Sequence, residues 1–137
     1  MGHLLNLCFW PVAVLARPAT GLPSGPSIHH MLLLDNGLVF HNTPEQGEHL
    51  DSLDASLKGL QAWRWDIAPD YQGAAHVRLI EALENPLPYH YSLNNCQQTV
   101  SRIVTGVAQS PTLRAAGLCL GFLGVIYLAD QFERTPR

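Results

Sequence analysis

The sequence predicts an α+β domain in which a small antiparallel sheet packs on a helix that carries a cysteine. The hydrophobic runs 28–34 and 38–41 are joined by Asp-Asn-Gly at 35–37, a strong signal for a β-hairpin. The segment 96–105 spaces its apolar residues three and four apart, as one face of a buried helix does. Cys96 begins that segment, so we expect it in the first turn of the helix.

The remaining elements follow from shorter patterns of the same two kinds. Alternation, or short apolar runs bounded by breakers, predicts further strands at residues 10–15 and 62–67. Helical spacing between capping residues predicts further helices at residues 52–58 and 74–83. Segments rich in Gly, Pro and polar residues are expected to be loops at residues 20–26 and 42–47.

Composition excludes several classes of protein. The 137 residues suit one domain, and a net charge of −3 with no run of Lys or Arg gives no footprint for nucleic acid. Three cysteines without a Cys-x-x-Cys pair make a poor disulfide framework, so we expect a reducing, cytoplasmic environment. No positive residue precedes the apolar stretch near the N-terminus, so a signal peptide is not expected. The seven histidines lack zinc-motif spacing, and we expect neither a metal nor a cofactor.

The C-terminal part differs from the rest of the chain. Residues 115–129 carry no charge, and as a helix they would reach about 22 Å, less than the roughly 30 Å of a bilayer core. We therefore divide the chain into a domain at 1–110 and a hydrophobic helix at 111–137. That helix is expected either to pack on the domain or to attach it to a membrane or a partner.

Cys96 and the hairpin histidines are the residues most suited to chemistry. A helix N-terminus lowers the pKa of a thiol and offers free N–H groups to an oxyanion, which suits a nucleophile. Such a nucleophile needs a base and a group that orients the base. His29 and His41 flank the hairpin turn and can meet across it. His30 is the alternative base, because a register slip of one residue would exchange the two faces of the strand.

Two motifs resemble those of the lecithin retinol acyltransferase-like family. His29, the Asp-Asn-Gly turn and His41 twelve residues later resemble its H-box, and Tyr91-Ser-Leu-Asn-Asn-Cys96 resembles its NC motif. The likeness covers roughly residues 10–129. It implies a circularly permuted papain-like or NlpC-like fold, with Cys96 as nucleophile, His29 as general base and His41 as orienting group. It also implies a membrane lipid or other acyl ester as substrate, attacked to give an acyl-thioester.

Three functions remain open from the sequence. The chain resembles a thiol acyltransferase or lipid hydrolase, because all three candidate catalytic residues are present. It also resembles compact picornaviral H-box/NC proteins, which would act by binding host proteins or membranes. In support of that reading, Gln97-Gln98-Thr99 stands where the acyltransferase family usually has Glu-His-Phe. A peptidase or amidase of the NlpC type is the third, because it would use the same site.

Overall fold

A computed structural model describes residues 9–20 and 28–134, with side chains described as far as residue 123. Within these residues the chain forms a five-stranded sheet in the order β4-β3-β2-β1-β5, with every neighbouring pair antiparallel. The predicted α+β class with a small antiparallel sheet is therefore confirmed. Most of the loop predicted at 20–26 lies outside the described residues.

The strands correct the sequence analysis at one point. Their bounds are β1 Pro11–Pro18, β2 Ile28–Leu34, β3 Leu38–Thr43, β4 Gly47–Ser52 and β5 Trp63–Asp66. The hairpin of β2 and β3 is confirmed, but the loop predicted at 42–47 is shorter than expected, because only residues 44–46 form the turn. β3 continues to Thr43, and β4 pairs with it through six residues. β4 contains two acidic residues and a histidine, so it lacks the strand-like composition that sequence reasoning relies on.

Most helix ends lie near the predicted residues. The bounds of the helices are α1 Leu53–Leu57, α2 Pro69–Glu84, α3 Cys96–Thr105 and α4 Pro111–Arg134. The exception is the start of α2, which lies at Pro69 and not at the predicted residue 74. Ala68 before it makes no side-chain capping bond that would mark this start. The Ser52 hydroxyl accepts from the backbone N–H of Ala55 and begins α1. Asn95 begins α3 with a capping box, and Gly106 ends it at a φ of 81°. Local capping chemistry accounts for why these predictions held.

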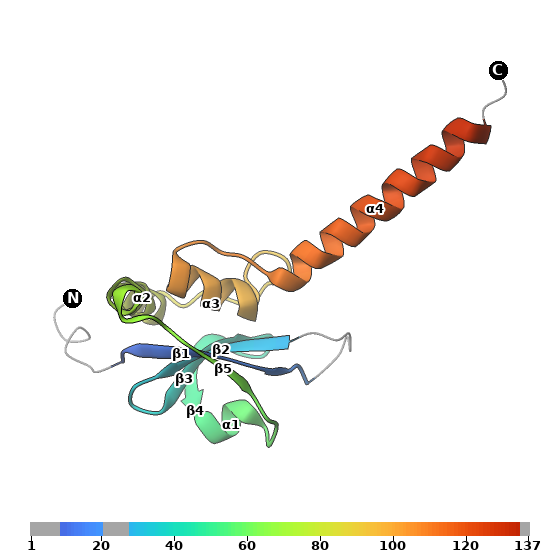
Figure 1. The fold of residues 1–137 in the computed structure, drawn as a ribbon. Coiled ribbons are helices and arrows are strands. Elements are labelled where there is room, and N and C mark those ends of the chain that lie inside the picture. The colour runs from blue at the N-terminus through green and yellow to red at the C-terminus, as the bar shows by residue number, and fades with distance from the viewer. Residues whose placement is uncertain (1–8, 21–27, 135–137) are drawn as a thin grey trace.

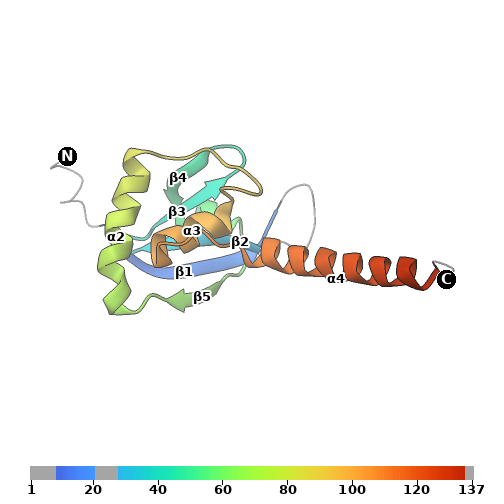
Figure 2. The same ribbon diagram turned by 90° about the horizontal axis from the view of Figure 1, so that it is seen from above.

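The helices divide between the two faces of the sheet. α2 and α3 cover one face, and α1 lies against the other (Figure 1). Viewed from above, α2 crosses one end of the sheet and α4 leaves from the opposite end (Figure 2). The larger apolar cluster joins Leu32, Leu34 and Phe40 to Val100 and Ile103 of α3. A smaller cluster lies on the α1 face and contains Leu15, Met31 and Val39.

The start of α3 lies where β2 and β3 stop pairing. These strands share only the pairs Leu32–Phe40 and Leu33–Val39. Beyond them, Asn42 of β3 donates a hydrogen bond to the carbonyl oxygen of Asn94, and the side chain of Gln97 donates to the carbonyl oxygen of Ile28 on β2. The N-terminus of α3 is thus anchored to both strands at their unpaired ends.

α4 extends away from the rest of the molecule as one long helix (Figure 1). Its apolar side chains are open to solvent; the exposed fractions are 75% for Leu118 and 69% for Phe122. The first turn of α4 contacts the domain through Thr112, which is hydrogen-bonded to Gln97, whereas the side chains of residues 114–123 are exposed. Across the part of the chain that the structure describes, no helix is both long and apolar enough to cross a membrane.

Candidate functional site

Cys96 occupies the first position of α3, directly after the capping residue Asn95. Its side chain is partly exposed, and its sulfur lies 4.0 Å from the carbonyl oxygen of Ile28. The backbone N–H of His30 also points at the sulfur. The thiol therefore lies against the backbone on both sides of His29.

The pKa of the Cys96 thiol is raised, whereas the sequence predicts that it is lowered. Burial raises the pKa of Cys96 above its ordinary value. The backbone N–H groups of His30, Gln97 and Cys96 and the positive charge of Arg17 oppose this rise without cancelling it. The predicted direction is wrong because desolvation of the thiolate outweighs the N–H groups at the helix start. At neutral pH the resting residue is a thiol.

His29 and His41 form a buried pair on neighbouring strands. His29 Nε2 and His41 Nδ1 lie 2.9 Å apart, and the two residues are only 8% and 3% exposed. Burial, with added repulsion from neighbouring imidazoles, lowers the pKa of His29 to about 3 and that of His41 to about 4. Both rings are therefore neutral at neutral pH, and one hydrogen shared between the facing nitrogens sets both tautomers.

The histidines and the helix lie on different faces of β2. Side chains alternate between the two faces along β2. His29 therefore lies on the α1 face, as Met31 does, whereas His30 lies on the face that packs against α3. Within the described residues, no hydrogen bond joins the thiol of Cys96 to an imidazole. The structure thus brings His29 and His41 together and leaves Cys96 beside their backbone.

Two further side chains complete the histidine cluster, and sequence analysis missed both. His41 pairs directly with His49 across β3 and β4, and their ring centroids are 4.4 Å apart. Asp51 lies two residues further along β4 on the same face. One ligand atom each from His41, His49 and Asp51 lie within 4.8 Å of one another, a set that could hold a metal ion. The His-x-Asp alternation was the available signal, but it has meaning only once β4 is recognised as a strand.

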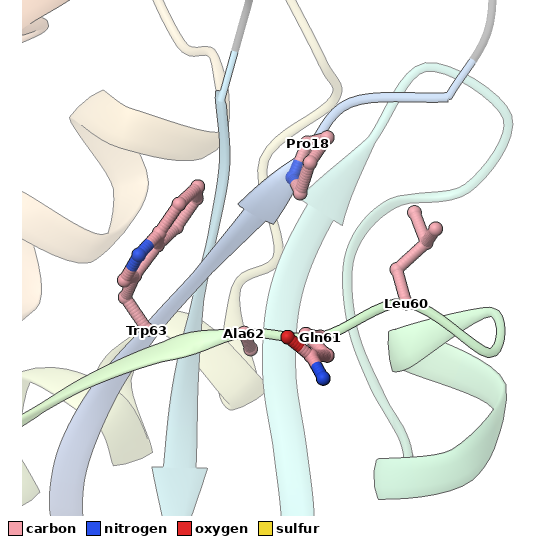
Figure 3. A pocket seen from close by; sticks show the side chains of 5 residues that line it. All are labelled: Pro18, Leu60, Gln61, Ala62 and Trp63. Carbon is pink, nitrogen blue, oxygen red and sulfur yellow. The ribbon is translucent and has the colours of Figure 1, made fainter.

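Two hollows open on the described part of the molecule. One, of about 210 Å³, lies between the sheet and α3 and is lined by His30, Gln97 and apolar residues that include Val14, Val100 and Val104. The other, of about 310 Å³, is lined by Pro18, Leu60, Gln61, Ala62 and Trp63 (Figure 3). The second hollow has no ionisable or nucleophilic lining residue, so only the first combines polar groups with the neighbourhood of the thiol.

The chain matches no protein-family model, no curated protein and no solved structure. Any function must therefore be argued from the geometry of the site.

Proposed function

We propose that this protein is a thiol-dependent acyltransferase or lipid hydrolase with a permuted papain-like fold of the H-box/NC type. One observation carries the proposal. The thiol of Cys96 begins a helix and lies against the backbone on both sides of His29, whose far nitrogen is bound to His41. A nucleophile, a base and a group that orients the base are the three kinds of group that thiol acyl transfer needs. The proposal requires the ring of His29 to reach the thiol, with which it forms no hydrogen bond among the described residues.

The reaction assigns one role to each group. His29 donates its Nε2 hydrogen to Nδ1 of His41, which leaves Nδ1 of His29 free to take the thiol proton. The thiolate attacks the ester carbonyl, and the carbonyl oxygen becomes an oxyanion. Collapse expels the alcohol, which takes the proton from His29, and leaves an acyl-thioester on Cys96. Water or an amine then takes the acyl group and restores the thiol.

The start of α3 can supply the oxyanion donors. The capping box uses the backbone N–H groups of Asn95 and Gln98. The backbone N–H groups of Cys96 and Gln97 instead favour the thiolate form of Cys96 and lower its pKa. They are the donors that we propose for the oxyanion of a carbonyl attacked by that sulfur.

Each of the three residues after the cysteine, Gln97, Gln98 and Thr99, makes hydrogen bonds that explain why it differs from the Glu-His-Phe of the acyltransferase family. Gln97 donates to the carbonyl oxygen of Ile28 and to the hydroxyl of Thr112, and a glutamate could do neither. Gln98 closes the capping box. The hydroxyl of Thr99 donates to the buried carboxylate of Glu48. These differences need no loss of catalysis to explain them.

The hollow beside α3 suits an acyl chain. Most of its lining surface is apolar, and two of its polar residues, His30 and Gln97, lie near the thiol; the other polar residues are Ser101, Thr105 and Gln109. An ester carbonyl at Cys96 would place its acyl chain along Val100 and Val104. In this arrangement His30 is the alternative base, because it lines the hollow and shares the face of α3.

α4 is the part of the chain that we propose attaches it to a lipid surface. Four apolar side chains on α4 are more than 60% exposed: Leu118, Leu120, Phe122 and Leu123. An exposed patch of this kind is typical of a membrane or protein interaction site. This feature also favours the second candidate function, a protein that binds membranes or host proteins without catalysis.

Intact-mass measurement after incubation with a short-chain phospholipid separates the two functions. We expect the mass to rise by one acyl group, and peptide mapping to locate that group on Cys96. Cys96→Ser and His29→Gln should abolish the adduct, whereas Cys119→Ser, which alters the exposed thiol on α4, should leave it unchanged. An unmodified wild-type chain, or an adduct that persists in Cys96→Ser, would contradict the acyltransferase proposal.

A further inference from the structure

We propose that His41, His49 and Asp51 bind a divalent transition-metal ion of the zinc type on the sheet face opposite α3. One ligand atom from each lies within 4.8 Å of the other two. A second observation is independent of that clustering. His41 is 97% buried, and its Nε2 has no hydrogen-bond partner among the described residues. A buried polar atom without a partner is costly in a folded protein, and a metal ion would satisfy it. The proposal departs from the expectation of no metal drawn from sequence spacing.

Hydrogen bonds at the other ring nitrogens prepare both imidazoles for a metal. Nδ1 of His49 lies 2.8 Å from the carbonyl oxygen of Gly47, which can only accept, so Nδ1 carries the hydrogen and Nε2 keeps its lone pair. When Nδ1 of His41 donates to Nε2 of His29, Nε2 of His41 likewise presents a lone pair. Metal-binding histidines commonly donate their second N–H in this way, which fixes ring orientation and raises ligand basicity.

The ligand set and its access suit zinc. Two imidazoles and one carboxylate leave a tetrahedral ion with one open position. Ligand atoms on such an ion lie roughly 3.3 Å apart, given metal–ligand distances near 2.0–2.1 Å. The set must therefore contract by about 1.5 Å at most. His49 and Asp51 are only partly buried and can make that movement, while His41 is held by the core.

Neighbouring charges set an upper limit on the affinity. Asp51 supplies negative charge, but the positive side chains of Arg17 and Lys58 also act on His41. The guanidinium of Arg17 donates hydrogen bonds to the carbonyl oxygens of Ser56 and Pro18. Direct coordination by the three ligands would supply the binding energy of a doubly charged ion, and repulsion from the two positive side chains would reduce it. We therefore expect weaker binding than at a zinc site without cationic neighbours.

Metal binding and the proposed acyl transfer require opposite tautomers of one hydrogen bond. The metal needs the hydrogen on Nδ1 of His41, donated to His29. The general base needs the hydrogen on Nε2 of His29, donated to His41. This consequence rests on the proposed function, and it predicts that a bound metal ion inhibits the reaction.

Titration of the full-length protein with Co²⁺, followed by visible absorption, tests the site. We expect the d–d bands of a bound ion, reversed by Zn²⁺, with no near-ultraviolet band from a thiolate ligand. His49→Gln and Asp51→Asn should each weaken binding at least about tenfold while keeping the circular dichroism spectrum. His90→Gln, an exposed histidine outside the cluster, and Cys96→Ser are the matched controls and should bind as the wild type does.

The possible outcomes separate this proposal from the proposed function. Absence of binding, unchanged affinity in His49→Gln and Asp51→Asn, or loss of affinity in Cys96→Ser would each overturn the metal site. The cobalt titration needs no enzymatic activity, so it keeps its meaning if acyl transfer fails. If acyl transfer occurs, Zn²⁺ should inhibit the wild type and inhibit His49→Gln much less.

Discussion

Two buried polar clusters lie on opposite faces of the sheet, and they differ in what their hydrogen bonds connect. On the α3 face, the carboxylate of Glu48 accepts from Asn94, Thr99 and Arg102 and from the backbone N–H of Leu87. These donors come from two parts of the chain that are distant from β4 in sequence. A buried charge with this many partners holds segments together.

The histidine cluster on the α1 face joins only neighbouring strands, and it leaves a buried ring nitrogen without a hydrogen bond among the described residues. His29, His41 and His49 come from three adjacent strands that already pair through their backbones. Among the described residues, Nε2 of His41 has no hydrogen-bond partner, and neither do two buried atoms near Glu48, Oδ1 of Asn42 and Nε of Arg102. Of these three atoms, only that of His41 belongs to a described group of potential metal ligands. The Glu48 network therefore joins segments that are distant in sequence, whereas the histidine cluster keeps a buried lone pair beside two partly exposed potential ligands.

The largest expected effect is on stability and lies in the Glu48 cluster. Glu48→Ala removes the acceptor of four donors and leaves Arg102 without its buried partner, so we expect a loss of about 3–5 kcal/mol in the free energy of unfolding. Urea denaturation measures it. His49→Gln, measured in EDTA, is the matched control on the other face and should cost less than about 1 kcal/mol. Equal losses at the two positions would contradict the view that the Glu48 cluster contributes more to stability than the histidine cluster does.

Acidification should lower the free energy of unfolding through the buried histidines. Burial lowers the pKa of His29, His30 and His41, so the unfolded chain binds more protons than the folded one below about pH 6.5. The free energy of unfolding should therefore fall as the pH drops from 6.5 toward 3, and remain flat with respect to these groups above 6.5. Urea denaturation in EDTA at several pH values measures this fall. His29→Gln should make it less steep, and an unchanged slope would contradict the assignment.

The reactivity of Cys96 tests whether burial on the α3 face of the sheet raises the pKa of this thiol. Because burial raises the pKa of this thiol, its rate of alkylation by iodoacetamide should reach half of its maximum above the roughly 8.5 of a free thiol. Mass spectrometry of the Cys96 peptide measures the rate, and the exposed Cys119 provides an internal control in a Cys8→Ser background. A midpoint at or below 8.5 would show that the helix start outweighs desolvation after all.

Truncation of α4 should have the smallest effect on the fold. Ser110 and Thr112 bind Gln97 at the start of α3, so the chain should be cut after Arg114, which keeps these contacts. Removal of residues 115–137 should change the free energy of unfolding by about 0.5 kcal/mol or less. It should also abolish co-sedimentation with liposomes of phosphatidylcholine and phosphatidylserine. An unfolded truncated chain would show instead that α4 is part of the core.

The elements that the sequence predicted well are those whose signals are local. The Asp-Asn-Gly turn fixes the hairpin of β2 and β3, and Asn95 and Gly106 fix the ends of α3. The same turn brought His29 and His41 within reach of each other, because spacing across a tight hairpin follows from strand geometry. β4 had no such signal, so His49, Asp51 and the buried Glu48 went unrecognised.

The sequence by itself therefore determined the α+β class, the hairpin and the position of Cys96 at the start of a helix. Turns, caps and periodic patterns act between residues that are close along the chain, so the amino acids alone can express them. Only the tertiary structure decided that His29 faces away from α3, that the pKa of Cys96 is raised, and that His41 meets His49 and Asp51. Those outcomes depend on strand pairing and on which groups lose water, and both are set by residues distant in the chain.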